Sequence, residues 1–478
     1  MDAQQFQLHI AFFPYMAQGH LIPTMDMARL FVRHGVKATI ITTPSNAPLF
    51  SKTIERDRQL GFEIFIQLMD FPSAEVGLPE GCENASSINT PEMISKFYRA
   101  ISLLENPLEN VLQDCQPNCL VADMMFPWAT EIANKFGIPR LVFHGVSTFS
   151  LCVFDSLRRY DIYKSLASDF DPFTVLGLPN QIKLTRLQLP NYIREENELT
   201  EALDQIIQSV LKSYGVLINS FYELEPKYLE HYRNVMGRKA WLIGPLSLCN
   251  KETEDKVQRG DTTSIDEHEC LKWLALKKPN SVLYICFGSM FKFPRPQLLE
   301  LARALEASGQ NFIWVLKNEG KEEDHQWLPE GFEMRMKGKG LIIRGWAPQL
   351  LILDHEATGG FMTHCGWNST LEAVAAGVPM VTWPLYAEQF FNEKLVTEVL
   401  KVGTNVGSQE WSTYEKKIII KMEDIRKAVT MVMAGEEGEV MRNRAKELKE
   451  MARQAIEAGG SSFSYLNAFL EELKAINV

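Results

Sequence analysis

Apolar runs of strand length that alternate with helix-like segments are the feature that most constrains the fold of this chain. The run at 8–13 is followed by a helix-like segment at 23–34 and by a second apolar run at 37–42. Pro23 suits the first turn of a helix, where its missing N–H costs nothing, and Gly35 suits the end. Strands joined through a helix are parallel, and a parallel sheet needs both faces covered. The opening therefore predicts a doubly wound α/β sheet.

The same alternation starts again in the second half, after a polar segment. Residues 250–268 are charged and almost free of large apolar side chains, which is typical of an interdomain linker. Strand-like runs at 281–287, 311–316 and 340–344 follow. A chain of 478 residues also suits two domains of roughly 200 residues each. We therefore predict an N-terminal domain at 1–249, a linker at 250–268 and a second domain at 269–455, followed by a terminal segment at 456–478.

Composition excludes several classes of protein. The net charge is −11 and no basic run is present, which argues against nucleic-acid binding. The eight cysteines have no metal-type spacing, and no apolar run reaches the ~18–20 residues that span a bilayer. The N-terminus lacks the pattern of a signal peptide. We expect a cytoplasmic protein with no membrane span and no metal site.

Polar residues follow three of the predicted strands in the first half. His20 comes just before a helix, Asp123 ends the run at 119–122, and His144 follows the run at 140–143. Ligands of doubly wound sheets bind beyond the carboxyl ends of the strands. A helix N-terminus favours neutral imidazole, as a general base requires, and a carboxylate can orient that base. Alternatively, His20 is a cap or a surface residue, Asp123 caps a helix, and His144 belongs to a loop.

Two segments of this half, 149–163 and 187–208, are rich in large apolar residues and interrupt the α/β alternation. Such insertions often form the walls of an apolar pocket. They are equally compatible with core helices.

The segment 346–377 combines groups suited to a nucleotide. Trp346 beside Gln349 suits stacking and hydrogen bonding to a base, although such a Trp is more commonly a packing residue. The run 359–369 predicts a strand, a Gly-rich turn and a helix N-terminus, which together form an anion site. Glu372 suits ribose hydroxyls, as acidic residues do in dinucleotide sites. The alternative makes Ser369 a helix cap and Glu372 its capping-box partner.

Other nucleotide signatures are weak or missing. Gly288-Ser289 at a strand end is a weak phosphate signal. Neither a G-x-G-x-x-G fingerprint after a first strand nor a G-K-[ST] motif occurs, which disfavours a dehydrogenase or a P-loop protein.

The stretch 346–389 resembles, over its full 44 residues, the signature box of the plant UDP-dependent glycosyltransferases of family 1. The motifs WAPQ and HCGWNS, together with Glu372 and the closing Glu388-Gln389, stand where that family has them. The opening FPYMAQGH, the strand-end Asp123 and FGS at 287–289 extend the resemblance to most of the chain. PSNA at 44–47 and EQFFNEKLV at 388–396 resemble the group D branch, which glycosylates flavonoids, triterpenoids and other lipophilic plant products.

The resemblance implies a GT-B fold, in which two Rossmann-like domains face each other across the site. Domain 1–249 would bind the acceptor, 269–455 would bind the UDP-sugar, and the helix in 456–478 would pack back on the first domain. We expect such a chain to act as a monomer. The implied donor-binding residues are Ser289, Trp346, Ala347, Gln349, His364, Gly366, Trp367, Asn368, Ser369, Glu372, Glu388 and Gln389.

Within this set, Trp346 would stack on uracil and Glu372 would bind the ribose. His364, Asn368, Ser369 and Ser289 would hold the diphosphate. Trp367, Glu388 and Gln389 would meet the sugar, and the family pattern with Trp and Gln at these places goes with UDP-glucose. The predicted acceptor-pocket residues are Met16, Met125, Phe126, His144 and Phe390.

The resulting hypothesis is an inverting O-glucosyltransferase that uses UDP-glucose without a metal or bound cofactor. His20 would be the general base and Asp123 would orient it, and the acceptor would be a lipophilic plant metabolite such as a flavonoid, triterpenoid or steroid. One alternative is a UDP-sugar epimerase or hydrolase on the same scaffold. Another is a non-catalytic nucleotide-sugar-binding protein.

Overall fold

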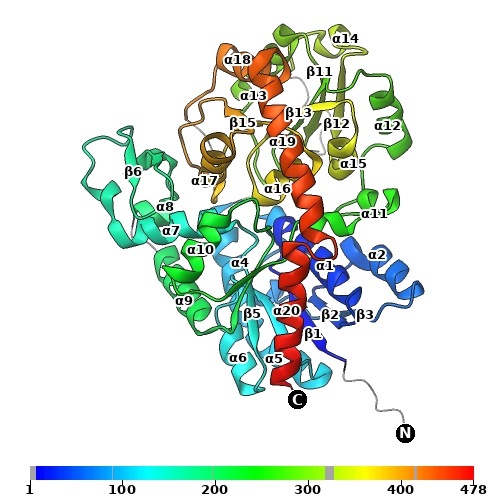
Figure 1. The fold of residues 1–478 in the computed structure, drawn as a ribbon, viewed down its shortest axis with the longest axis vertical. Coiled ribbons are helices and arrows are strands. Elements are labelled where there is room, and N and C mark those ends of the chain that lie inside the picture. The colour runs from blue at the N-terminus through cyan, green and yellow to red at the C-terminus, as the bar shows by residue number, and fades with distance from the viewer. Residues whose placement is uncertain (1–6, 89, 196–197, 318–327, 414–416, 478) are drawn as a thin grey trace.

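The computed structural model describes residues 7–88, 90–195, 198–317, 328–413 and 417–477. It has two lobes, each built on a parallel sheet with helices on both faces (Figure 1). The first six residues, on which the expectation about a signal peptide partly rests, lie outside the described residues. So does Val478, the end of the predicted terminal segment.

The first lobe contains a seven-stranded sheet in the order β3-β2-β1-β4-β5-β8-β9, and every strand pair in it is parallel. The strands are β1 (His9–Phe13), β2 (Lys37–Thr42), β3 (Ile64–Leu68), β4 (Cys119–Asp123), β5 (Arg140–Phe143), β8 (Gly215–Ile218) and β9 (Ala240–Leu242). The predicted doubly wound sheet is confirmed. The sequence did not point to β3, an edge strand whose residues are mostly half-buried or exposed and which therefore lacks a continuous apolar pattern.

The helices of this lobe lie around its sheet. They are α1 (Gln18–Val32), α2 (Pro48–Gln59), α3 (Ser73–Val76), α4 (Pro91–Leu103), α5 (Glu105–Cys115), α6 (Ala129–Lys135), α7 (Thr148–Tyr160), α8 (Asn191–Arg194), α9 (Glu198–Lys212) and α10 (Pro226–Asn234). The predicted insertions form α7, α8 and part of α9. Between α7 and α8 lies an antiparallel hairpin, β6 (Phe173–Val175) and β7 (Ile182–Leu184), that the sequence did not indicate.

Helix α1 begins earlier than the sequence predicts. The Ala17 carbonyl accepts hydrogen bonds from the N–H groups of His20 (2.9 Å) and Leu21 (2.8 Å), so the first turn precedes Pro23. Pro23 therefore lies inside the helix and is not its first residue. Because proline has no N–H, the carbonyl four residues earlier, that of Gly19, lacks its helical donor.

The second lobe contains a six-stranded parallel sheet in the order β12-β11-β10-β13-β14-β15. Its strands are β10 (Val282–Cys286), β11 (Asn311–Leu316), β12 (Gly340–Arg344), β13 (Thr358–Thr363), β14 (Met380–Thr382) and β15 (Gly403–Asn405). Its helices are α12 (Glu267–Ala275), α13 (Arg295–Ser308), α14 (Phe332–Arg335), α15 (Gln349–Asp354), α16 (Trp367–Ala376), α17 (Gln389–Lys394), α18 (Met422–Met433) and α19 (Gly435–Ile456), with a π-helix at Leu395–Leu400.

The lobes are joined twice. Between β9 and β10 the chain passes through α11 (Thr253–Val257), and after α19 it returns to the first lobe as α20 (Ser461–Ile476). Figure 1 shows α20, in red, running beside the first lobe near β1. Leu466, Phe469 and Leu473 of α20 are buried in the same apolar cluster as residues of β1 and β2. The domain boundaries given above stay a prediction.

Candidate active site

One cavity of about 950 Å³ lies between the lobes and is lined from both sides. In the first sheet the strand order reverses between β1 and β4, and in the second it reverses between β10 and β13. Ligands of open α/β sheets bind at the carboxyl ends of the strands beside such a reversal. The segments that follow β1, β10 and β13 all line the cavity. The points where the strand order reverses in the two sheets therefore face one common site.

His20 and Asp123 form a hydrogen-bonded pair at the reversal of the first sheet. His20 is in the first turn of α1, directly after the β1 loop, and Asp123 is the last residue of β4. The distance from His20 Nδ1 to Asp123 Oδ2 is 2.6 Å. Asp123 is 1% exposed and its other oxygen accepts the N–H of Met125 at 3.0 Å. The carboxylate is thus held in place, and it in turn fixes the imidazole ring.

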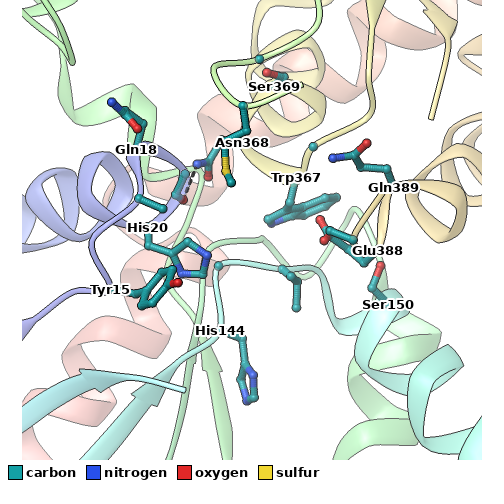
Figure 2. A pocket seen from close by; sticks show the side chains of 18 of the residues that line it. Tyr15, Gln18, His20, His144, Ser150, Trp367, Asn368, Ser369, Glu388 and Gln389 are labelled. Carbon is teal, nitrogen blue, oxygen red and sulfur yellow. Dashed lines mark hydrogen bonds between the residues drawn. The ribbon is translucent and has the colours of Figure 1, made fainter. Parts of the chain in front are cut away.

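This pairing determines which nitrogen of His20 is free. An ionised carboxylate only accepts hydrogen bonds, so Nδ1 carries the proton and Nε2 presents a lone pair. The side chain of His20 is 24% exposed and lines the cavity. Figure 2 shows the ring among pocket residues of both lobes, with Tyr15 beside it. The arrangement suits proton abstraction from a hydroxyl group bound in the cavity.

The protonation of His20 differs from the expectation based on its helix position. Burial lowers the pKa of His20, but the charge of Asp123 and the hydrogen bond to it, with a smaller contribution from Glu388, raise it above its ordinary value. The helix N-terminus was expected to favour the neutral ring. A carboxylate in direct contact outweighs that effect, which is worth typically 0.3–1 kcal/mol at a helix end.

All of the donor-binding residues implied by the resemblance line this one cavity. They come from the ends of β10, β12 and β13 and from helices α15, α16 and α17. They are Ser289, Trp346, Ala347, Gln349, His364, Gly366, Trp367, Asn368, Ser369, Glu372, Glu388 and Gln389.

Two buried polar atoms of this wall lack partners among the described residues. These are Nδ1 of His364 and Oδ1 of Asn368, both next to the N-terminus of α16. A Cβ added at Gly288 or Gly366 would collide with the ring of His364, so bare backbone surrounds this histidine. Burial lowers the pKa of His364 to about 4, which keeps the ring neutral while no anion is present. Unpartnered polar groups beside free helix N–H groups are suited to a phosphate-bearing ligand.

The capping alternative for Ser369 and Glu372 is wrong. Helix α16 begins at Trp367, with Gly366 as its N-cap, so Ser369 already lies within the first turn. Gln349 links the two side chains, because its amide donates to Ser369 Oγ at 3.2 Å and to Glu372 Oε2 at 2.7 Å. Glu372 is therefore an oriented, buried acceptor on the cavity wall.

The orientation of the Gln389 side-chain amide at the cavity is fixed by hydrogen bonds. Its side-chain carbonyl accepts the backbone N–H groups of Leu385 and Tyr386, both at 3.0 Å. The NH₂ end also bonds the Tyr386 side chain, which leaves one of its two N–H groups for a ligand. Glu388 beside it accepts a hydrogen bond from Asn392 at 3.0 Å, and burial raises the pKa of Glu388.

Two residues of α16 connect the lobes across the cavity. The Trp367 indole N–H donates to the Asn219 carbonyl at 2.7 Å, and the Asn368 amide donates to the Gly19 carbonyl at 2.7 Å. Figure 2 shows Asn368 and His20 facing the pocket from opposite lobes. What Trp367 offers a ligand is consequently its ring, since its indole N–H is already used and its backbone N–H bonds Glu388.

Two of the five residues predicted for the acceptor pocket line the cavity. Met125 and His144 line the cavity, whereas Met16, Phe126 and Phe390 do not and are fully buried. Their neighbours Tyr15, Met125 and Gln389 face the cavity instead, because adjacent side chains point in different directions. Phe126 stacks on Phe13 with ring centroids 4.1 Å apart.

A further part of the apolar wall comes from α7 and α9. The sequence indicated these segments as walls but no individual residues. The apolar lining residues there are Leu151, Phe154, Leu203, Ile206, Ile207 and Val210. Their helical spacing is a signal for an apolar face, but it does not distinguish a pocket from the core. At the same end, burial lowers the pKa of His144 to about 4.

Sequence reasoning also missed Arg259, which lies in the predicted linker and lines the cavity. Its guanidinium contacts Asp26 in α1 and Glu372 in α16. A single arginine in a charged linker has no distinguishing pattern, so no sequence signal was available.

Two kinds of structural feature are absent from the described residues. Among these, no three His, Cys, Asp or Glu side chains are grouped as a metal ion would need. Within the same part of the chain, no helix combines the length and apolar character needed to cross a membrane.

A cleft between two parallel sheets, with nucleotide-type groups on one side and a carboxylate-paired histidine on the other, is the architecture of a GT-B glycosyltransferase. Comparisons with known proteins agree. Residues 84–442 match the family profile described as UDP-glucoronosyl and UDP-glucosyl transferase. The chain belongs to this family, within the plant family 1 UDP-glycosyltransferases, and is a hexosyltransferase that takes a UDP-sugar donor and a small-molecule acceptor.

Individual relatives cover nearly the whole chain. A scopoletin glucosyltransferase of Nicotiana tabacum is 57% identical over 98% of both chains. An anthocyanin 3'-O-beta-glucosyltransferase of Gentiana triflora is 54% identical, over 98% of this chain and 99% of the relative. The crystal structure of Glycyrrhiza uralensis UGT73P12 complexed with glycyrrhetinic acid 3-O-monoglucuronide has a TM-score of 0.94 and 43% identity, covering 99% of this chain and 96% of that one. The predicted family and GT-B fold are confirmed.

Proposed function

We propose that the chain transfers glucose from UDP-glucose, with inversion at the anomeric carbon, to a hydroxyl or carboxyl group of a lipophilic plant metabolite such as a flavonoid or triterpenoid. The observation that carries the proposal is the position of His20. Its free Nε2 edge borders the cavity that the donor-binding residues line from the opposite lobe, and Asp123 holds its other nitrogen at 2.6 Å.

In the proposed reaction, Nε2 of His20 takes the proton of the acceptor hydroxyl as its oxygen attacks the anomeric carbon. Asp123 stabilises the imidazolium that forms. UDP leaves from the opposite face, which inverts the configuration. Its developing negative charge is stabilised by the N-terminus of α16 with Asn368, Ser369 and His364, a preorganised electrostatic role that needs no metal ion.

Glucose is the proposed sugar because Trp367 and Gln389 stand at the end of the cavity where the sugar would lie. Two backbone N–H groups hold the carbonyl of Gln389 and its NH₂ group bonds the Tyr386 side chain, which leaves one N–H to donate to a sugar hydroxyl. Both sequence relatives described above are named as glucosyltransferases.

A lipophilic acceptor is supported by the composition of the wall around His20. Leu151 and Phe154 of α7, with Ile206 and Val210 of α9, form an apolar surface on the acceptor side. The relatives are named for scopoletin and an anthocyanin. A cytoplasmic location is proposed as well, since all eight cysteines are free thiols.

Product analysis tests this function. The purified protein is incubated with UDP-glucose and a panel of phenolic and triterpenoid acceptors, with and without EDTA, and products are read by mass spectrometry and by NMR of the anomeric proton. We expect hexose addition with a β-linkage that EDTA does not reduce. UDP release without acceptor and without any glucoside would point to a hydrolase, and an α-linkage would refute inversion.

A further inference from the structure

Arg259 joins a buried carboxylate of each lobe. Its Nε donates to Asp26 Oδ2 at 2.8 Å and its Nη1 donates to Glu372 Oε1 at 2.6 Å. Asp26 is on α1 and is 1% exposed, and Glu372 is on α16 and is 3% exposed. The side chain of Arg259 is itself 11% exposed and lines the cavity. One guanidinium thus balances two carboxylates that would otherwise be buried without a counter-charge.

The linker backbone next to Arg259 packs against Trp346 and is hydrogen-bonded to it. Ser264 donates its N–H to the Trp346 carbonyl at 2.8 Å and accepts the Trp346 N–H on its Oγ at 3.0 Å. A Cβ at Gly260 would collide with the Trp346 indole and would lie 3.1 Å from Ile22 Cδ1 of α1. The linker is therefore part of the cavity wall on the nucleotide side.

The hydrogen bonds of Glu372 leave it able to accept more. Oε1 accepts from Arg259 and Oε2 accepts from Gln349, so each oxygen uses one of its two lone pairs. A charge-assisted hydrogen bond on one oxygen and an amide hydrogen bond on the other fix the plane of the carboxylate. The remaining lone pairs are suited to a vicinal diol, which is the chemistry of a ribose ring.

We propose that Arg259 is a positioning residue for the donor, which holds Glu372 in the orientation that accepts the ribose hydroxyls of the UDP-sugar. The inference rests on the proposed role of the cavity as the UDP-glucose site. Asp26 anchors the guanidinium from the first lobe, on the same helix that carries His20 six residues earlier. Donor binding in the second lobe is thereby linked through the linker to the helix of the proposed base.

The test compares substitutions of Arg259 with a control elsewhere in the linker contacts. Arg56→Gln is the control, because Arg56 ties the linker to the first lobe through Asp255 and Glu254 and does not line the cavity. Arg259→Gln, Arg259→Lys and Asp26→Asn are measured beside it. Calorimetry gives the Kd of UDP, kinetics give KM for UDP-glucose and for the acceptor, and thermal melting reports folding.

We expect Arg259→Gln to raise the Kd of UDP and the donor KM by roughly 10-fold or more, with acceptor KM within about twofold. Arg259→Lys keeps the positive charge but cannot donate to both carboxylates in the same geometry, so its Kd should lie between those of the unmodified protein and Arg259→Gln. Asp26→Asn should also raise the Kd. Arg56→Gln should leave donor binding within about twofold of the unmodified protein, even where its melting temperature falls.

Two results would overturn the inference. Equal donor binding in Arg259→Gln and Arg56→Gln would make Arg259 a structural linker residue only. Tighter UDP binding in Arg259→Gln would mean that the guanidinium competes with ribose. Should Arg259→Gln not fold, Arg259→Lys and Asp26→Asn decide, and unchanged Kd values in both would refute the inference. Failure of the unmodified protein to bind UDP would refute the proposed function instead, and the inference with it.

Discussion

Asn368 of the second lobe donates its side-chain N–H to the Gly19 carbonyl of the first lobe at 2.7 Å. That carbonyl lies in the first turn of α1, where it would normally accept the N–H of the residue four positions later. This residue is Pro23, which has no N–H. The acceptor for the contact between the lobes therefore exists because a proline interrupts the hydrogen bonding of the helix, one residue before His20.

Restoring the helical donor should weaken this contact. In Pro23→Ala, the new N–H competes with Asn368 for the Gly19 carbonyl, so we expect kcat/KM for UDP-glucose to fall several-fold. The free energy of unfolding should change by no more than about 1 kcal/mol, because the added hydrogen bond and the greater chain entropy of the unfolded state offset each other. Steady-state kinetics and urea unfolding measure the two quantities. Unchanged kinetics would show that the contact has no role in turnover.

Removal of the proposed base should separate chemistry from binding. His20→Ala is expected to lower kcat by about 10²- to 10⁴-fold, the usual value of general-base catalysis. UDP should still bind with a Kd within about threefold, since the hydrogen bond of the His20 side chain goes to Asp123 of its own lobe. Glucoside formation and calorimetry provide the measurements. Full turnover in this variant is incompatible with His20 as base.

The pH profile should report the His20–Asp123 pair. His20 acts as a base only when neutral, so transfer rises as the pH increases through its pKa, which Asp123 holds above the ordinary value of about 6.5. Asp123→Asn removes the negative charge and lowers that pKa. We expect the acidic limb of kcat/KM to move about one unit or more to lower pH, while the maximal rate falls.

The profile is recorded between pH 5 and 9 at a fixed acceptor concentration. Glu388 also raises the pKa of His20, by a smaller contribution. Glu388→Gln should therefore shift the limb in the same direction by less. If the acidic limb does not move in Asp123→Asn, a group other than His20 causes it.

The NH₂ end of the Gln389 amide can be tested while the hydrogen bonds of its carbonyl end are kept. In Gln389→Glu, the carboxylate still accepts the N–H groups of Leu385 and Tyr386, but the NH₂ donor is lost. A carboxylate oxygen cannot donate, so the sugar hydroxyl loses the hydrogen bond that it accepted from the NH₂ group. That loss costs about 1–3 kcal/mol, and kcat/KM for UDP-glucose should fall by about 10- to 100-fold. The Kd of UDP, which has no sugar, should stay within about threefold, and an equal loss for both ligands would place the sugar elsewhere.

His364 should take up a proton when UDP binds. Burial holds its pKa at about 4, and a nearby diphosphate favours the imidazolium. We expect calorimetry at pH 6 in buffers of different ionisation enthalpy to give a net proton uptake that disappears in His364→Asn. The same titration of His20→Ala is the control, and equal uptake in His364→Asn and the unmodified protein would exclude His364 as the group that protonates.

The parts of the fold that the sequence predicts are those with local patterns. The runs that became β2, β5 and β11 have the predicted bounds because continuous apolar stretches between polar turns signal buried strands. The edge strand β12 is mostly half-buried but keeps an apolar run, and it also has the predicted bounds. The half-exposed edge strand β3 has no such pattern. The start of α1 was placed too late because Pro23 is normally a residue of the first turn, and only the tertiary contact of Gly19 with Asn368 explains its position within the helix.

For the site, the sequence by itself determined which residue types stand at strand ends and helix starts, including His20, Asp123 and the stretch 346–389. These follow from local backbone direction and from the resemblance. Only the tertiary structure decided which side chains meet. It placed Met16, Phe126 and Phe390 in the core, because neighbouring side chains on a loop or helix point in different directions. It also placed Arg259 between Asp26 and Glu372, residues 233 and 113 positions away, and no local pattern records contacts at that separation.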